Sequence, residues 1–289
     1  FVLLLMIFVM LPRAQVSAGR INEVLNSDIA VREGKDDGRQ TEEKGSITFN
    51  DVSFRYPGAA ENCLEHISFQ VNQGETLAII GATGSGKSTL AGLAARLYDA
   101  SEGEVLIDGK NVKDYSFRDK MGYVTQKAVL FSDTIEGNVA FGEAAQAITE
   151  EDVKKAIDIS QAQEFIDKME EGLYSHIAQS GGNVSGGQKQ RLSIARAIAR
   201  NPEILIFDDS FSALDYKTDK ELRRRLSTDL KGTTCVIVAQ RIGTIRHADK
   251  IIVLDDGKMA GIGTHEELMK NCEVYQEIAL SQLSKAELA

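Results

Sequence analysis

The stretch from Gly81 to Thr89 constrains this chain more than any other. It reads Gly-Ala-Thr-Gly-Ser-Gly-Lys-Ser-Thr and fits G-x-x-x-x-G-K-[ST], the pattern of a phosphate-binding loop, or P-loop. Thr76–Ile80 before it is a short apolar run that predicts a buried strand, and Ser88–Leu97 after it predicts a helix. In that context the backbone N–H groups at the helix start can bind phosphate, because they carry partial positive charge.

Single residues of this loop have predicted roles. We expect the Lys87 side chain to reach the β- and γ-phosphates of a nucleotide and the Ser88 hydroxyl to hold Mg²⁺. The alternative, a glycine-rich turn with a chance lysine, is disfavoured by the strand and helix on either side. The residues predicted to line the phosphate site are Gly81, Thr83, Gly84, Ser85, Gly86, Lys87, Ser88 and Thr89.

Composition narrows the possible partners. The 289 residues carry a formal net charge of −10 and are 43% hydrophobic, which is enough for a full α/β core. An acidic chain offers no broad basic surface to a phosphodiester backbone, so we do not expect nucleic acid as a partner. The cysteines Cys63, Cys235 and Cys272 are widely spaced, which predicts reduced thiols in a cytosolic domain.

The amino-terminal segment is apolar from Phe1 to Leu11. Two interpretations compete: the cytosolic end of a transmembrane helix whose start is missing, or the core of a signal peptide. The run is shorter than the roughly 20 residues that cross a bilayer, and the starting Met and basic leader of a signal peptide are absent. We favour the membrane helix, continued into the cytosol over residues 1–25 and followed by a charged, solvated linker over residues 26–45.

A folded domain is predicted over residues 46–289. Period-two alternation with a slip at Asn50-Asp51 predicts a bulged strand, which belongs to an antiparallel layer. Tyr56 follows this strand and either stacks on a purine base or closes the edge of the sheet.

From Thr149 to Leu173 apolar residues recur at helical spacing, with Thr149 and Asp152 as a cap pair. This predicts an inserted helical subdomain over about residues 127–200.

A second helix is predicted to begin at Ser185-Gly186-Gly187-Gln188, where Ser185 and Gln188 fit the S-x-x-Q capping box. The glycines leave backbone N–H groups accessible to an anion. Two phosphate-binding helix starts in one domain suggest nucleotide held between two copies. An ordinary glycine-rich cap is the alternative.

The apolar run Ile204–Phe207 ends in Asp208-Asp209 and predicts a strand followed by acids. Asp208 is placed to act on Mg²⁺, as the acid after a buried strand does in P-loop enzymes, and an acidic turn without function is the alternative. Another buried strand, Cys235–Ala239, ends at Gln240. Strands separated by helices around a P-loop predict a doubly wound α/β core with a parallel sheet.

Taken in order, these motifs resemble the nucleotide-binding domain of ABC transporters. The similarity extends from Ser46 to about Ile278, and the Ser-Gly-Gly-Gln signature between the P-loop and the acidic strand is highly specific to that family. The apolar start resembles the end of the last membrane helix of an ABC exporter. The resemblance implies ATP and Mg²⁺, a membrane domain in cis, a place on the cytoplasmic side of the cell membrane, and a second ABC half across a head-to-tail ATP interface.

The resemblance also implies roles for single residues. Tyr56 would stack on the base, Gln126 would contact Mg²⁺ and the attacking water, and Asp215 would communicate across the dimer. The segment 127–142 would contact the membrane domain. The signature residues that would bind the γ-phosphate of the partner's ATP are Ser185, Gly186, Gly187 and Gln188.

Two positions depart from the family pattern. In the family, Glu usually follows the magnesium-binding Asp, whereas this chain has Asp209 there. In the family, His usually occupies the switch position, which follows the next strand, whereas this chain has Gln240 there. A carboxylate one methylene shorter lies further from the attacking water, and a neutral amide cannot supply the cationic form of an imidazole. Together the changes resemble the slow ATP site of a heterodimeric exporter, whose signature, intact apart from Val184, completes the partner's site. A non-hydrolysing ATP clamp, a homodimer with two slow sites and a soluble ATPase of DNA repair or translation are the alternatives.

Overall fold

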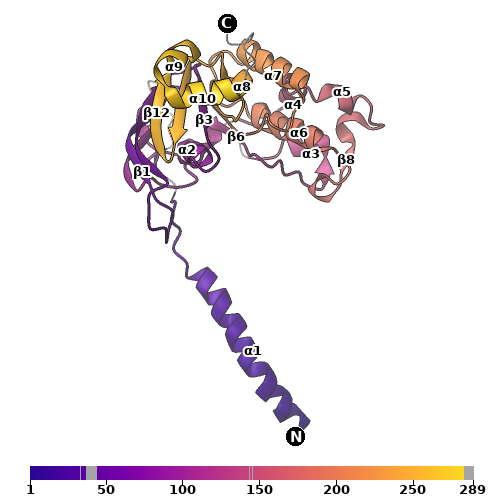
Figure 1. The fold of residues 1–289 in the computed structure, drawn as a ribbon. Coiled ribbons are helices and arrows are strands. Elements are labelled where there is room, and N and C mark those ends of the chain that lie inside the picture. Colours follow the sequence, from indigo (N-terminus) through magenta and orange to yellow (C-terminus); the bar gives the residue numbers. More distant parts are fainter. Residues whose placement is uncertain (33, 37–43, 143, 145, 283–289) are drawn as a thin grey trace. The chain divides into compact units, whose positions relative to one another are not determined.

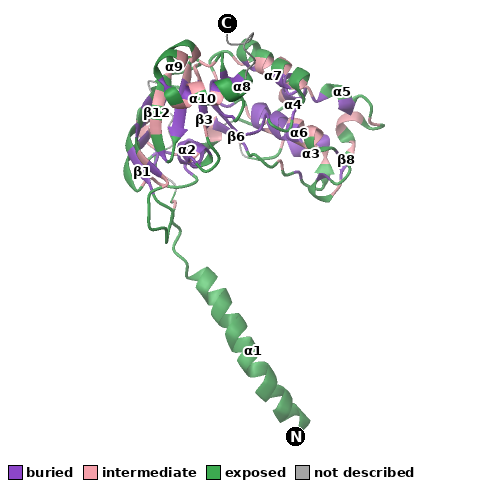
Figure 2. Cartoon of the chain, viewed as in Figure 1, coloured by how far each residue is buried: buried purple, intermediate pink, exposed green. Residues whose placement is uncertain are grey.

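The computed structural model describes residues 1–289 except 33, 37–43, 143, 145 and 283–289. It divides into two units, Phe1–Arg32 and Glu33–Ala289. The first unit contains one helix, α1 (Val2–Leu25), which runs through Pro12 and is exposed along its whole length (Figure 2). With 24 residues and a mean hydropathy of 1.8 in its most apolar part, α1 is long and apolar enough to cross a membrane. A signal sequence would meet the same criteria, so the membrane helix stays a prediction.

The first sheet of the second unit is antiparallel, with the strand order β2-β1-β4-β5. Its register shifts between Phe49 and Val52, and Asp51 has a φ of 50°, so the predicted bulge is confirmed. The strands are β1 (Ile47–Phe54), β2 (Leu64–Val71), β4 (Glu102–Ile107) and β5 (Lys110–Asn111).

The second sheet carries the P-loop and has the order β12-β11-β3-β10-β9-β6. All neighbours from β11 to β6 are parallel, which confirms the predicted core, whereas β12 is an antiparallel edge strand. The strands are β3 (Thr76–Gly81), β6 (Met121–Val124), β9 (Ile204–Asp208), β10 (Thr234–Val238), β11 (Lys250–Asp255) and β12 (Lys258–Gly263). A separate short pair joins β7 (Asp133–Thr134) to β8 (His176–Ile177).

Both faces of the second sheet are covered along β11, β3, β10 and β9, which is why these strands are largely apolar, whereas the edge strand β12 is partly exposed. Along β3, Leu77 and Ile79 face the apolar core shared with the antiparallel sheet and α2, while Ala78 and Ile80 face the core shared with α6 and α10. Figure 1 shows α3, α4, α5 and α6 gathered on the side away from β1. These helices lie within the predicted helical subdomain, whose boundaries stay a prediction. The helices are α2 (Lys87–Ala94), α3 (Ile135–Val139), α4 (Glu150–Ile159), α5 (Gln163–Ile166), α6 (Gly186–Ala199), α7 (Tyr216–Asp229), α8 (Ile242–Ile245), α9 (His265–Asn271) and α10 (Glu273–Gln282).

Helix α2 ends at Ala94, earlier than the predicted end at Leu97. Arg96 has a φ of 49°, and the N–H groups of Leu97 and Arg96 donate to the carbonyls of Gly92 (2.8 Å) and Leu93 (3.0 Å). This pair of hydrogen bonds is a Schellman motif, which terminates a helix with a left-handed residue. An arginine in the left-handed region gives no sequence signal comparable to glycine, so the pattern missed it.

Part of the predicted linker contacts the folded domain. The Asp36 N–H donates to the carbonyl of Asp114 (3.1 Å), and the Asp36 carboxylate pairs with Lys110 at 2.5 Å. Asp36 is exposed but contacts the folded domain, and the linker over residues 26–45 stays a prediction. Residues 33 and 37–43 of that segment lie outside the described residues.

Candidate nucleotide-binding site

The P-loop connects β3 to α2, and two of its glycines are required by the backbone. A Cβ at Gly81 would lie 2.1 Å from the carbonyl oxygen of Leu254, and Gly86 caps α2 with a φ of 96°. The Ser85 hydroxyl is buried, with no hydrogen-bond partner in the described part of the chain. A phosphate oxygen would satisfy this hydroxyl, so the loop fits the predicted ligand.

Lys87 holds a positive charge inside this loop. Its ammonium donates to the carbonyls of Gly81 (3.0 Å) and Ala82 (2.6 Å), and only 9% of the residue is exposed. Burial lowers the pKa of Lys87, and the nearby carboxylates of Asp209 and Asp208 oppose this shift. Phosphate oxygens are stronger acceptors than neutral carbonyls, so the ammonium is placed to exchange them for a triphosphate.

The two predicted magnesium ligands on this chain's P-loop helix and strand β9 lie in direct contact. The Ser88 hydroxyl donates to Asp208 Oδ1 at 2.7 Å. A hydroxyl and a carboxylate are the hard oxygen ligands that Mg²⁺ takes alongside phosphate and water. These two residues therefore fit the ion, and its binding there stays a prediction.

Tyr123 is a site residue that the sequence did not reveal. Its hydroxyl donates to Asp208 Oδ2 at 3.2 Å, so both oxygens of Asp208 are held by O–H donors. Burial, reinforced by the Asp208 charge, raises the pKa of Tyr123, which keeps the hydroxyl protonated and able to donate. The contact arises because β6 pairs with β9, with Tyr123 beside Ile206. A tyrosine near the end of a strand signals nothing until that pairing is known.

Removing this hydroxyl tests its role in metal binding. We expect Tyr123→Phe to weaken Mg²⁺ binding to the ATP-bound chain by roughly tenfold, because the groups that orient a metal ligand contribute to metal affinity. Titrating Mg²⁺ against the chain loaded with a fluorescent ATP analogue measures this. Tyr174→Phe, at an exposed tyrosine, is the matched control. Equal Mg²⁺ affinities in both variants would contradict the expectation.

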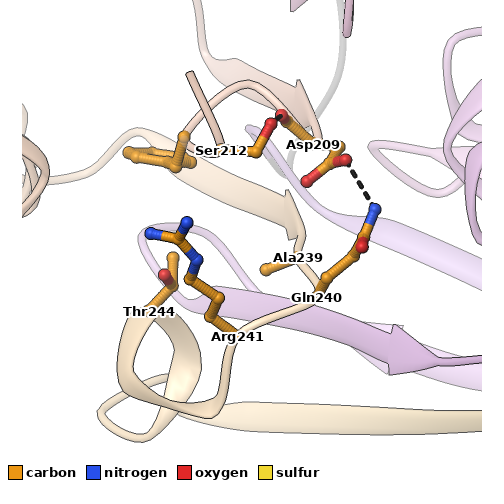
Figure 3. Close-up of a pocket in the computed structure, with 7 residues that line it drawn as sticks. Asp209, Ser212, Ala239, Gln240, Arg241 and Thr244 are labelled. Atoms are coloured by element: carbon orange, nitrogen blue, oxygen red, sulfur yellow. Dashed lines mark hydrogen bonds between the residues drawn. The ribbon is translucent and has the colours of Figure 1, made fainter. Parts of the chain in front are cut away.

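Asp209 is clamped by two side-chain amides. Its Oδ2 atom accepts from Gln240 Nε2 at 2.8 Å and from Gln126 Nε2 at 3.1 Å, and Figure 3 shows the Gln240 amide directed at the carboxylate. Burial raises the pKa of Asp209, while the two hydrogen bonds lower it and the charge of Asp208 raises it further. The Gln126 amide nitrogen donates to Asp209 in this structure. The predicted contact of Gln126 with Mg²⁺ stays a prediction.

A cavity of about 260 Å³ opens beside this clamp. The Arg241 and Thr244 side chains lie across it from Ser212, whose hydroxyl donates to the backbone carbonyl of Asp209 at 2.8 Å (Figure 3). The lining residues are Asp209, Phe211, Ser212, Ala239, Gln240, Arg241 and Thr244. The segments after β9 and β10 thus meet at the acidic end of the site.

Tyr56 lies next to the P-loop helix. Its hydroxyl is 2.9 Å from Thr89 Oγ1, and its ring makes edge contacts with Phe54 and Tyr98 at centroid distances of 4.8 and 5.3 Å. The residue is 36% exposed. An aromatic ring held at its edges and open to solvent can offer a face to a base, and stacking stays a prediction.

The signature residues form the start of α6. Ser185 Oγ accepts from the Gln188 N–H (3.3 Å), and the Gln188 side chain accepts from the Ser185 N–H (2.8 Å), so the predicted capping box is confirmed. Val184 is buried in the apolar core, where a branched aliphatic side chain suits the position. Asp215 caps α7 by accepting from Thr218, which lowers the pKa of Asp215. Binding to a partner's ATP and communication across a dimer stay predictions for these residues.

Comparison with known proteins agrees with this geometry. The family model described as ABC transporter matches residues 64–212. An uncharacterized ABC transporter ATP-binding protein of Mycobacterium bovis is 42% identical over 96% of this chain and 48% of its own length. An ATP-dependent lipid A-core flippase of Vibrio vulnificus is 40% identical over 81% of this chain and 41% of its own length.

A solved structure is similar over nearly the whole chain. The match is to the structure of a bacterial Atm1-family ABC exporter with ATP bound, with a TM-score of 0.86 and 32% sequence identity. The aligned region covers 97% of this chain and 49% of the exporter chain. The chain thus spans about half the length of the proteins it matches. It belongs to the ABC transporter family and has the fold of that family's nucleotide-binding domain.

Proposed function

We propose that this chain is the ATP-binding half of an ABC exporter, that its own ATP site hydrolyses slowly, and that its signature completes the competent site of a different partner half. In this arrangement the P-loop of each chain binds ATP, and the Ser185 helix start of the other chain closes over the γ-phosphate. Closure and opening of the two halves on the cytoplasmic side of the membrane would drive export.

Different residues of this chain would bind the base, the phosphates and the Mg²⁺ ion. Tyr56 would orient the base, Lys87 would hold the phosphates, and Ser88 and Asp208 would supply oxygen ligands to Mg²⁺. When bound, Mg²⁺ neutralises phosphate charge and polarises the phosphoryl group. The similar proteins include a lipid A-core flippase and an Atm1-family ABC exporter, which supports export as the class of activity.

The observation that supports slow hydrolysis at this site is the pair of amide hydrogen bonds to Asp209. A residue that polarises an attacking water must direct a free lone pair at that water within hydrogen-bond reach. Here one carboxylate oxygen accepts from both Gln126 and Gln240, and the side chain is a methylene shorter than Glu. Because burial raises its pKa, Asp209 does not lack basicity. Its shorter reach limits it, together with the two amides bound to Oδ2, which leave Oδ1 alone to accept from a water.

An exposed apolar surface supports contact with a membrane domain. Val129, Phe131 and Phe141 are 55%, 43% and 52% exposed, and the two phenylalanine rings are 4.3 Å apart. The Arg196 guanidinium lies over both rings, at 5.2 and 5.7 Å from their centroids. This surface falls in the segment 127–142, and clustered exposed rings are typical of an interaction site.

Photolabelling of the assembled exporter tests the proposal. Membranes are incubated with α-labelled azido-ATP, illuminated, and the nucleotide on each separated chain is identified. We expect triphosphate on this chain and diphosphate on its partner, because only the ATP bound at the partner's P-loop would turn over. Diphosphate accumulating rapidly on this chain would contradict both a slow site and an ATP clamp. Label of one kind on two identical chains would instead favour a homodimer.

A further inference from the structure

The backbone that carries Gln240 is bound from outside the nucleotide site. Residues 240–242, here called the switch loop, follow β10 and include the first residue of the short helix α8. Helix α10 ends at Gln282, and the Gln282 side chain hydrogen-bonds to the switch loop at two points. The partners lie 40 and 42 residues away in the sequence, so this is a tertiary contact.

The two hydrogen bonds involve both the nitrogen and the oxygen of the Gln282 side-chain amide. Gln282 Nε2 donates to the Gln240 carbonyl at 2.7 Å, and Gln282 Oε1 accepts from the Ile242 N–H at 2.9 Å. One planar group thus binds the backbone on both sides of Arg241, as a peptide unit does in a β-ladder. Arg241 is the N-cap of α8 and makes no side-chain cap bond, so Gln282 supplies the missing acceptor.

Helix α10 is fixed where it can deliver this amide. Tyr275, Ala279 and Gln282 are spaced i, i+4 and i+7, which places them on one face of the helix. Tyr275 and Ala279 are fully buried in the apolar core that also contains Ala239 and Ile242. Figure 1 shows α10 beside α8. The buried residues anchor the helix, and Gln282 extends the same face to the switch loop.

We propose that Gln282 is a positioning residue that fixes the switch loop and thereby holds the Gln240 side chain on Asp209. The contacts form a continuous series from α10, through the Gln240 carbonyl and the Gln240 amide, to Asp209 Oδ2. Helix α10 therefore positions the side chain that contacts Asp209. The importance of Gln240 rests on the proposed function, whereas the Gln282 contact does not.

An isosteric variant tests the contact. Gln282→Met keeps the length of the side chain and removes its donor and acceptor. We expect amide hydrogen exchange in residues 240–242 of the 289-residue chain to become about tenfold faster, the effect of losing one typical hydrogen bond. Gln276→Met is the matched control, because Gln276 lies on the same helix and donates to the carbonyl of Met269 at 3.0 Å. Gln282→Glu keeps the acceptor, so the Ile242 amide should stay protected.

A kinetic comparison tests the positioning role. Gln282 binds the backbone of residues 240 and 242, so its contacts do not depend on the side chain at position 240. In an exporter with Asp209→Glu and Gln240→His, adding Gln282→Met should therefore lower kcat several-fold and leave KM for ATP unchanged, because binding does not use the switch loop. Unchanged exchange in Gln282→Met would overturn the proposal, and so would faster exchange with unchanged kcat. If Asp209→Glu and Gln240→His produced no turnover, the proposed function would fail, and exchange measured in Gln282→Met and Gln282→Glu would still decide this proposal.

Discussion

Replacing Lys87 with alanine is expected to weaken ATP binding about 100-fold or more. Hydrogen bonds from a charged donor contribute roughly 1.5–3 kcal/mol each, and a lysine in a P-loop makes more than one to a triphosphate. A loss of about 2.7 kcal/mol already corresponds to 100-fold. Calorimetry with ATP and Mg²⁺ on the purified chain measures the change. Unchanged ATP binding by Lys87→Ala would refute the proposal that ATP binds at this loop.

The control for Lys87→Ala must separate binding from folding. Lys250→Ala removes a lysine that also donates to a backbone carbonyl, that of Gln70 at 3.0 Å, far along the sequence from the P-loop. We expect Lys250→Ala to bind ATP as the unmodified chain does. The thermal unfolding midpoint of each variant shows whether the domain is intact, because Lys87 is itself buried and hydrogen-bonded.

Restoring the residues typical of the family is expected to raise ATP hydrolysis at this site on the order of 10²-fold, the lower range for a well-placed general base. Asp209→Glu extends the carboxylate toward the attacking water, and Gln240→His removes one amide donor from it while adding a group that can carry positive charge. The two changes act on one reaction, so their effects are not expected to add. Phosphate release by an exporter whose partner site has been inactivated measures the gain.

The same double change combined with Lys87→Ala provides the control. If the added hydrolysis comes from this site, it must disappear when ATP can no longer bind there. A gain that persists would trace the hydrolysis to the partner. No gain in the double variant would show that the residues at 209 and 240 are not what limits this site.

Features made within a few residues were predictable from the sequence. The two predicted capping boxes, Thr149 with Asp152 and Ser185 with Gln188, each join residues three apart. Such a contact forms wherever the helix begins, whatever packs around it. The strand–loop–helix order of the P-loop and the bulge in β1 are local in the same sense. The end of α2 shows the limit, because Arg96 adopts a left-handed conformation that its residue type does not announce.

The sequence by itself determined the family, the motifs and the two unusual residues, Asp209 and Gln240. Only the tertiary structure decided what those residues touch. Sheet order places β6 beside β9, which brings Tyr123 to Asp208, and the packing of α10 in the core brings Gln282 to the switch loop. Such contacts depend on which strands and helices become neighbours, and that is set by burial of apolar faces over the whole domain.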